Sequence, residues 1–158
     1  MSGLVHGMKW CAAVVLLTAS LGAAESAGWI TNFEEAKKIA AEKKLPILMD
    51  FSGSDWCIWC QRLDSEVFAQ KAFQDYAKDN LVLFLADFPM RAKQPDALKN
   101  QNRQLQSIYR VSGYPTVILV SAQGDELART GYVRGGADAY VEHLKGLLSG
   151  RKSNAAGR

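Results

Sequence analysis

Cysteine, histidine and proline are scarce in this chain of 158 residues, which contains three, two and four of them, respectively. Three cysteines are too few for a disulfide-stapled scaffold, and their odd number leaves one to be explained separately. The net charge is only +3 and no block of lysine and arginine is present, which excludes a nucleic-acid-binding class. Hydrophobic residues make up 48% and charged residues 22%, as in ordinary globular proteins, so bulk disorder is excluded and one domain is expected.

The N-terminal segment has the features of a secretory signal. A lysine precedes an apolar run over residues 10–21, which has the length of a signal-peptide core and is short for a membrane-spanning helix. Small residues follow, so we predict a signal peptide over residues 1–24, cleaved between Ala24 and Glu25, and a periplasmic or secreted protein. An uncleaved membrane anchor is the alternative. Cleavage would remove Cys11 and leave two cysteines in a compartment that permits disulfides.

The remaining chain alternates between helical and strand-like patterns. We predict a domain over residues 25–150 and a flexible tail over residues 151–158. The expected elements begin with a helix capped by Thr31, a strand over 47–51 and one or two helices over 57–78. A central strand over 81–86, buried on both faces, and a helix over 100–109 with Leu105 and Ile108 facing inward are expected next. Strands over 116–120 and 126–130 and a helix over 137–148 ended by Gly150 complete the order. This order predicts an α/β fold, with a mixed sheet flanked by helices.

Two cysteines lie in the motif WCIWC, where the first predicted strand ends and a helix begins. The helix N-terminus favours the thiolate of Cys57, and Cys60, one turn later, is placed to close a disulfide or to resolve a mixed one. We therefore predict a redox pair in which Cys57 attacks and Cys60 resolves. A purely structural bridge is one alternative, although so short a loop removes little chain entropy. Zinc is another, but only His143 is left to complete the ligands, so we expect no metal.

A proline stands directly before the predicted strand over residues 116–120. Proline cannot donate to a sheet ladder, so Pro115 is expected at the first position of that strand. A cis bond before Pro115 would mark a functional feature, and an ordinary trans turn is the alternative.

The motifs WCIWC and GYPT, followed by a hairpin and a closing helix, resemble the thioredoxin superfamily over about residues 29–150. The stretches FSGSDWCIWCQRLDSEVF and QNRQLQSIYRVSGYPT are similar to small bacterial periplasmic reductases of the DsbH type and to the C-terminal domain of DsbD. The resemblance implies a thioredoxin-like fold with a cis-proline loop beside the Cys-x-x-Cys helix start. It also implies that the substrate backbone lies against Pro115 and that Tyr114 lines the same groove.

The sequence departs from the thioredoxin pattern in two respects. In that family a buried aspartate precedes the first cysteine by six residues, whereas Asp50 precedes Cys57 by seven, so either Asp50 or Asp55 is the candidate proton acceptor. The residues between the cysteines are Ile58 and Trp59 rather than glycine and proline, and a bulky Trp59 is expected to alter the choice of partner.

The residues around the cysteines also bear on the direction of electron flow. Trp56 is expected to shield the thiolate and contact partners, and also to pack at the start of the helix. Ile58 and Trp59 carry no charge that would stabilise a thiolate, which favours a reductase over an isomerase or oxidase. A copper-binding thiol module is the non-enzymatic alternative, with only Met49 and Met90 as thioether support.

The expected partners follow from the reductase hypothesis. We expect a monomer that acts on protein or peptide disulfides, with no cofactor beyond the Cys57–Cys60 disulfide. No nicotinamide or flavin motif is present, so a separate membrane-bound thiol donor is expected to re-reduce the pair.

Overall fold

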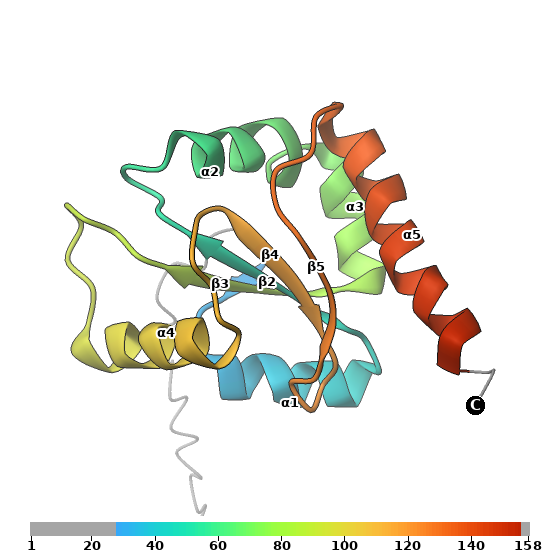
Figure 1. The fold of residues 1–158 in the computed structure, drawn as a ribbon, viewed down its shortest axis with the longest axis horizontal. Helices are drawn as coiled ribbons and strands as arrows, with labels where there is room; N and C mark the ends of the chain where they lie inside the picture. The colour runs from blue at the N-terminus through green and yellow to red at the C-terminus, as the bar shows by residue number, and fades with distance from the viewer. Residues whose placement is uncertain (1–27, 156–158) are drawn as a thin grey trace, which may run out of the picture.

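The structure is a computed structural model that describes residues 28–155 of the chain (Figure 1). Strands and helices alternate before a final pair of strands and a last helix. In chain order the elements are β1 (Trp29–Ile30), α1 (Phe33–Lys43), β2 (Ile47–Ser52), α2 (Ile58–Leu63), η1 (Asp64–Phe68), α3 (Lys71–Asn80), β3 (Val82–Asp87), α4 (Asp96–Ile108), β4 (Thr116–Val120), β5 (Glu126–Thr130) and α5 (Gly136–Ala155). Of these, η1 is a π-helix that directly continues α2.

The strands form one sheet of mixed direction, in the order β1-β3-β2-β4-β5. β2 pairs in parallel with β3 and antiparallel with β4, and β4 pairs antiparallel with β5. The predicted α/β fold with a mixed sheet is therefore confirmed.

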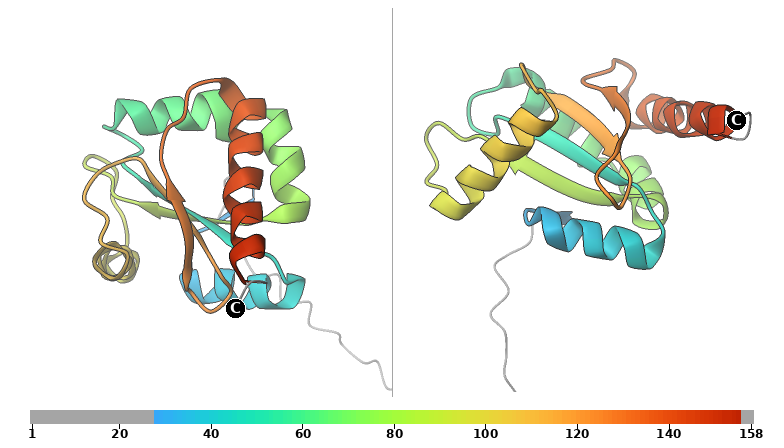
Figure 2. Two further views of the ribbon diagram at one scale, coloured as in Figure 1. Left: turned by 45° about the vertical axis from the view of Figure 1, so that its right-hand side comes forward. Right: turned by 60° about the horizontal axis from the view of Figure 1, so that its bottom comes forward.

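Helices cover both faces of the sheet (Figure 2). Each covered face has its own apolar core. α1 and α4 pack on one face, where Phe33 and Leu105 are buried. α2, η1, α3 and α5 pack on the other face, around Phe73 and Tyr140. Burial of apolar surface on both faces makes the sheet a rigid support for the turn that follows β2.

The fully buried strand is β2 and not the strand predicted over residues 81–86. All six residues of β2 are buried, whereas β3 alternates between buried and half-buried positions. β2 lies between β3 and β4, while the outer neighbour of β3 is β1, which is only two residues long. The prediction that residues 81–86 are the central strand, buried on both faces, is therefore wrong.

Two local predictions about helices are also wrong. Asn32, not Thr31, caps α1, because its Oδ1 accepts the backbone N–H of Glu35 at 3.1 Å. α4 begins four residues earlier than expected, at Asp96, and Ile108 is 68% exposed. Asn102 and Leu105 share the inward face of α4, and the helical rotation carries Ile108 away from it.

The last helix is longer than the sequence indicates. α5 starts at Gly136 and continues through Gly150 to Ala155, so its predicted end at Gly150 is wrong. A terminating glycine adopts positive φ, and Gly150 does not. The predicted signal peptide over residues 1–24 and the last three residues of the predicted tail lie outside the described residues. Within residues 28–155, no helix is long and apolar enough to span a membrane.

Candidate active site

The two cysteines meet at the turn between β2 and α2, where they form a disulfide with a Cα–Cα distance of 5.2 Å. Cys57 is the N-cap of α2, and its backbone N–H donates to the Gly53 carbonyl at 2.8 Å. Both cysteines are buried. Each sulfur also faces a backbone N–H: that of Cys60 lies 3.2 Å from Cys57 Sγ, and that of Gly53 lies 3.5 Å from Cys60 Sγ. Such donors stabilise negative charge on sulfur when the disulfide is opened.

Trp56 lies against the loop that follows β3. Its indole Nε1 donates to the Phe88 carbonyl at 2.8 Å, and its ring meets the Tyr114 ring edge-on at a centroid distance of 5.7 Å. Gly53 makes room for this indole, because a Cβ at that position would lie 2.4 Å from Trp56 Cε2. Trp56 is nevertheless 42% exposed, so it is both held in place and open to a partner.

Trp59 faces a different part of the chain. Its ring lies 5.3 Å from the Tyr132 ring, and the Arg62 guanidinium lies 5.0 Å above it. The Tyr132 hydroxyl donates to the carboxylate of Glu66 in η1. Trp59 remains 43% exposed and its neighbour Ile58 is 61% exposed. Both residues between the cysteines therefore present apolar surface.

The GYPT segment adjoins the redox turn through Tyr114. The Tyr114–Pro115 peptide bond is cis, and β4 begins at the next residue. The Tyr114 hydroxyl accepts a hydrogen bond from Gln106 Nε2 at 2.7 Å, and its ring contacts both Trp56 and Phe88. The structure thus brings together two motifs that are far apart in the sequence.

Asp50 is the buried carboxyl group closest in sequence to the redox turn. It is the fourth residue of β2, and its Oδ1 has no hydrogen-bond partner in the described part of the chain. Burial, reinforced by the negative charges of Asp64 and Asp87, raises its pKa to about 8. At neutral pH this carboxyl group is therefore largely protonated and can exchange its proton.

Asp55 has a different environment. Its carboxylate accepts hydrogen bonds from the backbone N–H groups of Met90, Arg91 and Ala92 at 2.7–2.9 Å. These bonds lower the pKa of Asp55, so the group stays ionised and its oxygens are occupied. Asp55 anchors the loop after β3, and of the two candidate proton acceptors only Asp50 keeps a free oxygen.

Several residues near the disulfide are not apparent from the sequence motifs. Arg62 follows Trp59 at helical i,i+3 spacing, a signal that could have paired them. Tyr132 and Phe88 lie in distant loops and have no such signal. Within the described residues, no group of three or more His, Cys, Asp or Glu is placed to hold a metal ion.

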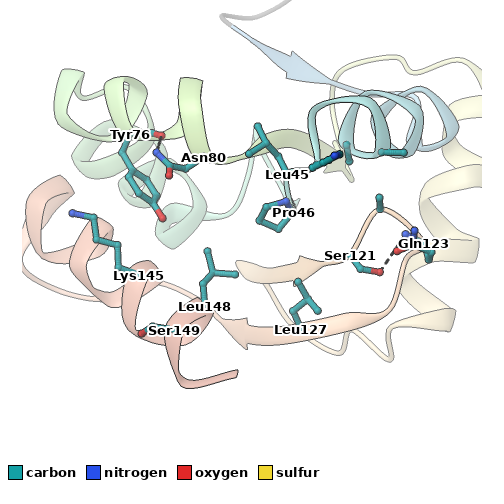
Figure 3. Close-up of a pocket in the computed structure, with 14 residues that line it drawn as sticks. Leu45, Pro46, Tyr76, Asn80, Ser121, Gln123, Leu127, Lys145, Leu148 and Ser149 are labelled. Atoms are coloured by element: carbon teal, nitrogen blue, oxygen red, sulfur yellow. Dashed lines mark hydrogen bonds between the residues drawn. The ribbon is translucent and has the colours of Figure 1, made fainter. Parts of the chain in front are cut away.

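A pocket of about 800 Å³ lies at the other end of the sheet (Figure 3). Pro46, which precedes β2, lines it together with Tyr76 and Lys145. The disulfide follows the opposite end of β2, so this pocket is separate from the redox turn. None of the site residues predicted from the sequence lines it.

Comparisons with known proteins agree with this geometry. Residues 33–145 match the family described as a thioredoxin-like domain. The disulfide bond reductase DsbH of Chlamydia pneumoniae is 33% identical over 117 residues, which cover 74% of this chain and 70% of that protein.

Two solved structures are similar to the chain. A DsbH oxidoreductase superposes with a TM-score of 0.74 at 30% identity, covering 83% of this chain and 94% of the other. The oxidised C-terminal domain of DsbD from Neisseria meningitidis has a TM-score of 0.52 at 22% identity over 70% of this chain and 88% of that one, which supports the fold alone. The chain belongs to the thioredoxin-like family and is a disulfide oxidoreductase.

Proposed function

We propose that the chain is a disulfide reductase that acts in the periplasm or outside the cell after removal of residues 1–24. The observation that carries the proposal is the Cys57–Cys60 disulfide at a helix start, with only uncharged side chains between the cysteines. Without a cationic side chain between the cysteines, the reduced form is less stabilised, which favours electron donation. The name of the relative DsbH, disulfide bond reductase, supports the same direction.

The proposed reaction begins with the reduced pair. The Cys57 thiolate attacks one sulfur of a substrate disulfide, the substrate S–S bond breaks, and the departing sulfur takes up a proton. The Cys60 thiol then loses its proton and attacks Cys57 Sγ. The mixed disulfide breaks and the second substrate thiol leaves. In total, the substrate gains two electrons and two protons, and Cys57 and Cys60 become the disulfide seen in the structure.

Asp50 is the proposed acceptor of the Cys60 proton. Its pKa of about 8 is close to that of a free thiol, so it can take and return a proton near neutral pH. The substrate chain is proposed to lie against Pro115 and Tyr114, between Trp56 and Ile58. An external dithiol, presented by a membrane protein, then reduces the Cys57–Cys60 disulfide for the next cycle.

The test uses the chain without residues 1–24. We expect it to catalyse insulin reduction by dithiothreitol, and Cys57→Ser to abolish that turnover. Cys60→Ser is expected to accumulate mixed disulfides through Cys57, which mass spectrometry can identify. Tight copper(I) binding without any disulfide turnover would contradict the proposal.

The direction of electron flow is tested by equilibration with glutathione. Strong oxidants of this kind have potentials near −120 mV, and thioredoxin lies near −270 mV. If the chain is a reductase, its reduction potential should be closer to that of thioredoxin than to that of the strong oxidants. A value near −120 mV, or repair of scrambled disulfides without net reduction, would instead favour an oxidase or an isomerase.

A further inference from the structure

Two indoles flank the redox turn, and each is fixed by a different part of the chain. Trp56 is held by the Phe88 carbonyl and Tyr114, whereas Trp59 is held by Arg62 and Tyr132. Phe88 follows β3 and Tyr132 follows β5, so the two indoles are supported by different segments of the chain. Trp56 with Tyr114 forms one aromatic surface beside the turn. Trp59 with Tyr132 forms a second, which we call the Trp59 wall.

The support of Trp59 depends on a long-range hydrogen bond. The Tyr132 hydroxyl donates to Glu66, which projects from η1 rather than from a regular α-helix. π-Helical turns of this kind occur often at functional sites. The bond fixes the Tyr132 ring beside Trp59, and a fixed aromatic surface binds an apolar side chain with little loss of conformational freedom.

Apolar surface is concentrated at this end of the protein. Among residues 28–150, only five large hydrophobic side chains are exposed, and Trp56, Ile58, Trp59 and Met90 are four of them. Met90 is 76% exposed in the loop that Asp55 anchors. An exposed apolar cluster around a reactive group is typical of a surface that binds a partner.

Arg62 places a positive charge beside Trp59. The Arg62 guanidinium lies over the indole and takes part in no ion pair with another residue of the described chain. The nearby Glu66 carboxylate already accepts the Tyr132 hydroxyl. Arg62 thus keeps N–H donors for a carboxylate that approaches along the indole.

We propose that Trp59 determines substrate specificity, with Tyr132 and Glu66 as its positioning residues. The favoured substrate is an extended polypeptide disulfide with a large apolar residue next to its cysteine and an acidic residue beside that. The apolar side chain packs on Trp59, and the carboxylate meets Arg62. This inference rests on the proposed reductase function, because it assigns the substrate of the same cysteine pair.

The experiment measures single-turnover reduction of three disulfide peptides by the reduced chain. The first carries Leu and Glu beside its cysteine, the second has Ser in place of Leu, and the third has Lys in place of Glu. Each rate is divided by the rate of the same variant with hydroxyethyl disulfide, so that changes in thiol reactivity cancel. For the unmodified chain, we expect the first peptide to react about tenfold faster than either of the others.

The variants distinguish the positioning of Trp59 by Tyr132 and Glu66 from a general effect on the stability of the protein. For Trp59→Ala, we expect the ratio of the normalised rates for the Leu and Ser peptides to be close to one. For Tyr132→Phe, we expect this ratio to be about threefold lower than for the unmodified chain. Glu66→Gln, which keeps an oxygen acceptor for Tyr132, should preserve the ratio, whereas Glu66→Leu should lower it. Ile108→Ala is the matched control, since it removes an exposed apolar side chain from α4, and it should leave the ratio unchanged.

The possible failures are distinguishable. If the unmodified chain reduces hydroxyethyl disulfide but treats the three peptides alike, the specificity inference is wrong and the reductase proposal stands. The same conclusion follows if the preference survives Trp59→Ala, or if Ile108→Ala lowers it equally. If the reduced chain reacts with no disulfide at all, the proposed function itself fails.

Discussion

The Asp55 carboxylate accepts the backbone N–H of Met90 at 2.9 Å, which ties the turn before Cys57 to a loop 35 residues further along the chain. The same carboxylate accepts the N–H groups of Arg91 and Ala92. The position of exposed Met90 therefore depends on one side chain of the redox turn.

Replacement of Asp55 tests this anchor. Asp55→Ala removes the acceptor for three backbone N–H groups, so we expect faster amide exchange and faster proteolysis within residues 88–94. Asp55→Asn keeps one acceptor oxygen and should have a smaller effect. Hydrogen exchange followed by mass spectrometry would show the difference, and equal protection in all three proteins would contradict the anchoring role.

Gly53→Ala is expected to displace Trp56, because the new Cβ would lie 2.4 Å from Trp56 Cε2. Overpacking of this kind costs about 1–3 kcal/mol of unfolding free energy. The variant should show a shifted tryptophan emission and a lower midpoint in denaturant. Gly113→Ala is a matched control, since a Cβ there meets nothing within 4 Å. If both variants are equally stable, the close packing of Trp56 on Gly53 is not a constraint.

Asp50 makes the folded state less stable as the pH rises. Its pKa is about 8 in the folded protein and about 4 in an unfolded chain, so the folded state binds the extra proton between these values. The free energy of unfolding should therefore fall from about pH 4 to about pH 8 because of this group. Asp50→Asn removes the titration and should stabilise the protein by a few kcal/mol at pH 9 and much less at pH 4.

Denaturant titrations at several pH values would measure this effect. Asp50→Asn should also slow insulin reduction, since the variant cannot accept the Cys60 proton. A variant that is no more stable than the unmodified chain at pH 9 would show that the carboxyl group is not held protonated. If Asp50→Asn increases stability at pH 9 but leaves turnover unchanged, Asp50 has a raised pKa but takes no part in the reaction.

Asn102 is expected to contribute to stability through the end of β3. It is 1% exposed, and its Nδ2 donates to the Asp87 carbonyl at 2.9 Å. Asn102→Ala removes this buried hydrogen bond and should cost about 0.5–1.5 kcal/mol of unfolding free energy. Gln94→Ala removes a longer, 3.2 Å bond to the same carbonyl from a less buried residue and should cost much less. Thermal unfolding of the two variants side by side would test this difference.

Local sequence signals predicted much of the fold and the centre of the site. WCIWC stands where a strand gives way to a helix, and Pro115 of GYPT directly precedes a strand, as the periodicity and the proline indicate. Local signals led to wrong predictions where two candidate residues lie within one helical turn of each other. Thr31 and Asn32 are both good caps, and Ile108 is apolar but lies on the outer flank of α4.

The remainder of the site depends on residues that are distant in sequence. Trp59 and Tyr132 are 73 positions apart, and their contact depends on the path of the chain from β5 to α5. Tyr132 donates to Glu66 of the π-helix that continues α2, and no signal in the sequence indicated that π-helix.

The sequence by itself determined the redox pair, the order of the longer helices and strands, and the fold class. These properties follow from short-range spacing, turn chemistry and hydrophobic periodicity, which a linear chain displays directly. The tertiary structure alone decided which carboxyl group is buried without a partner and which side chains support each indole beside the disulfide. A raised pKa and a fixed aromatic wall both arise from the groups packed around a side chain, and packing brings those groups together from distant parts of the chain.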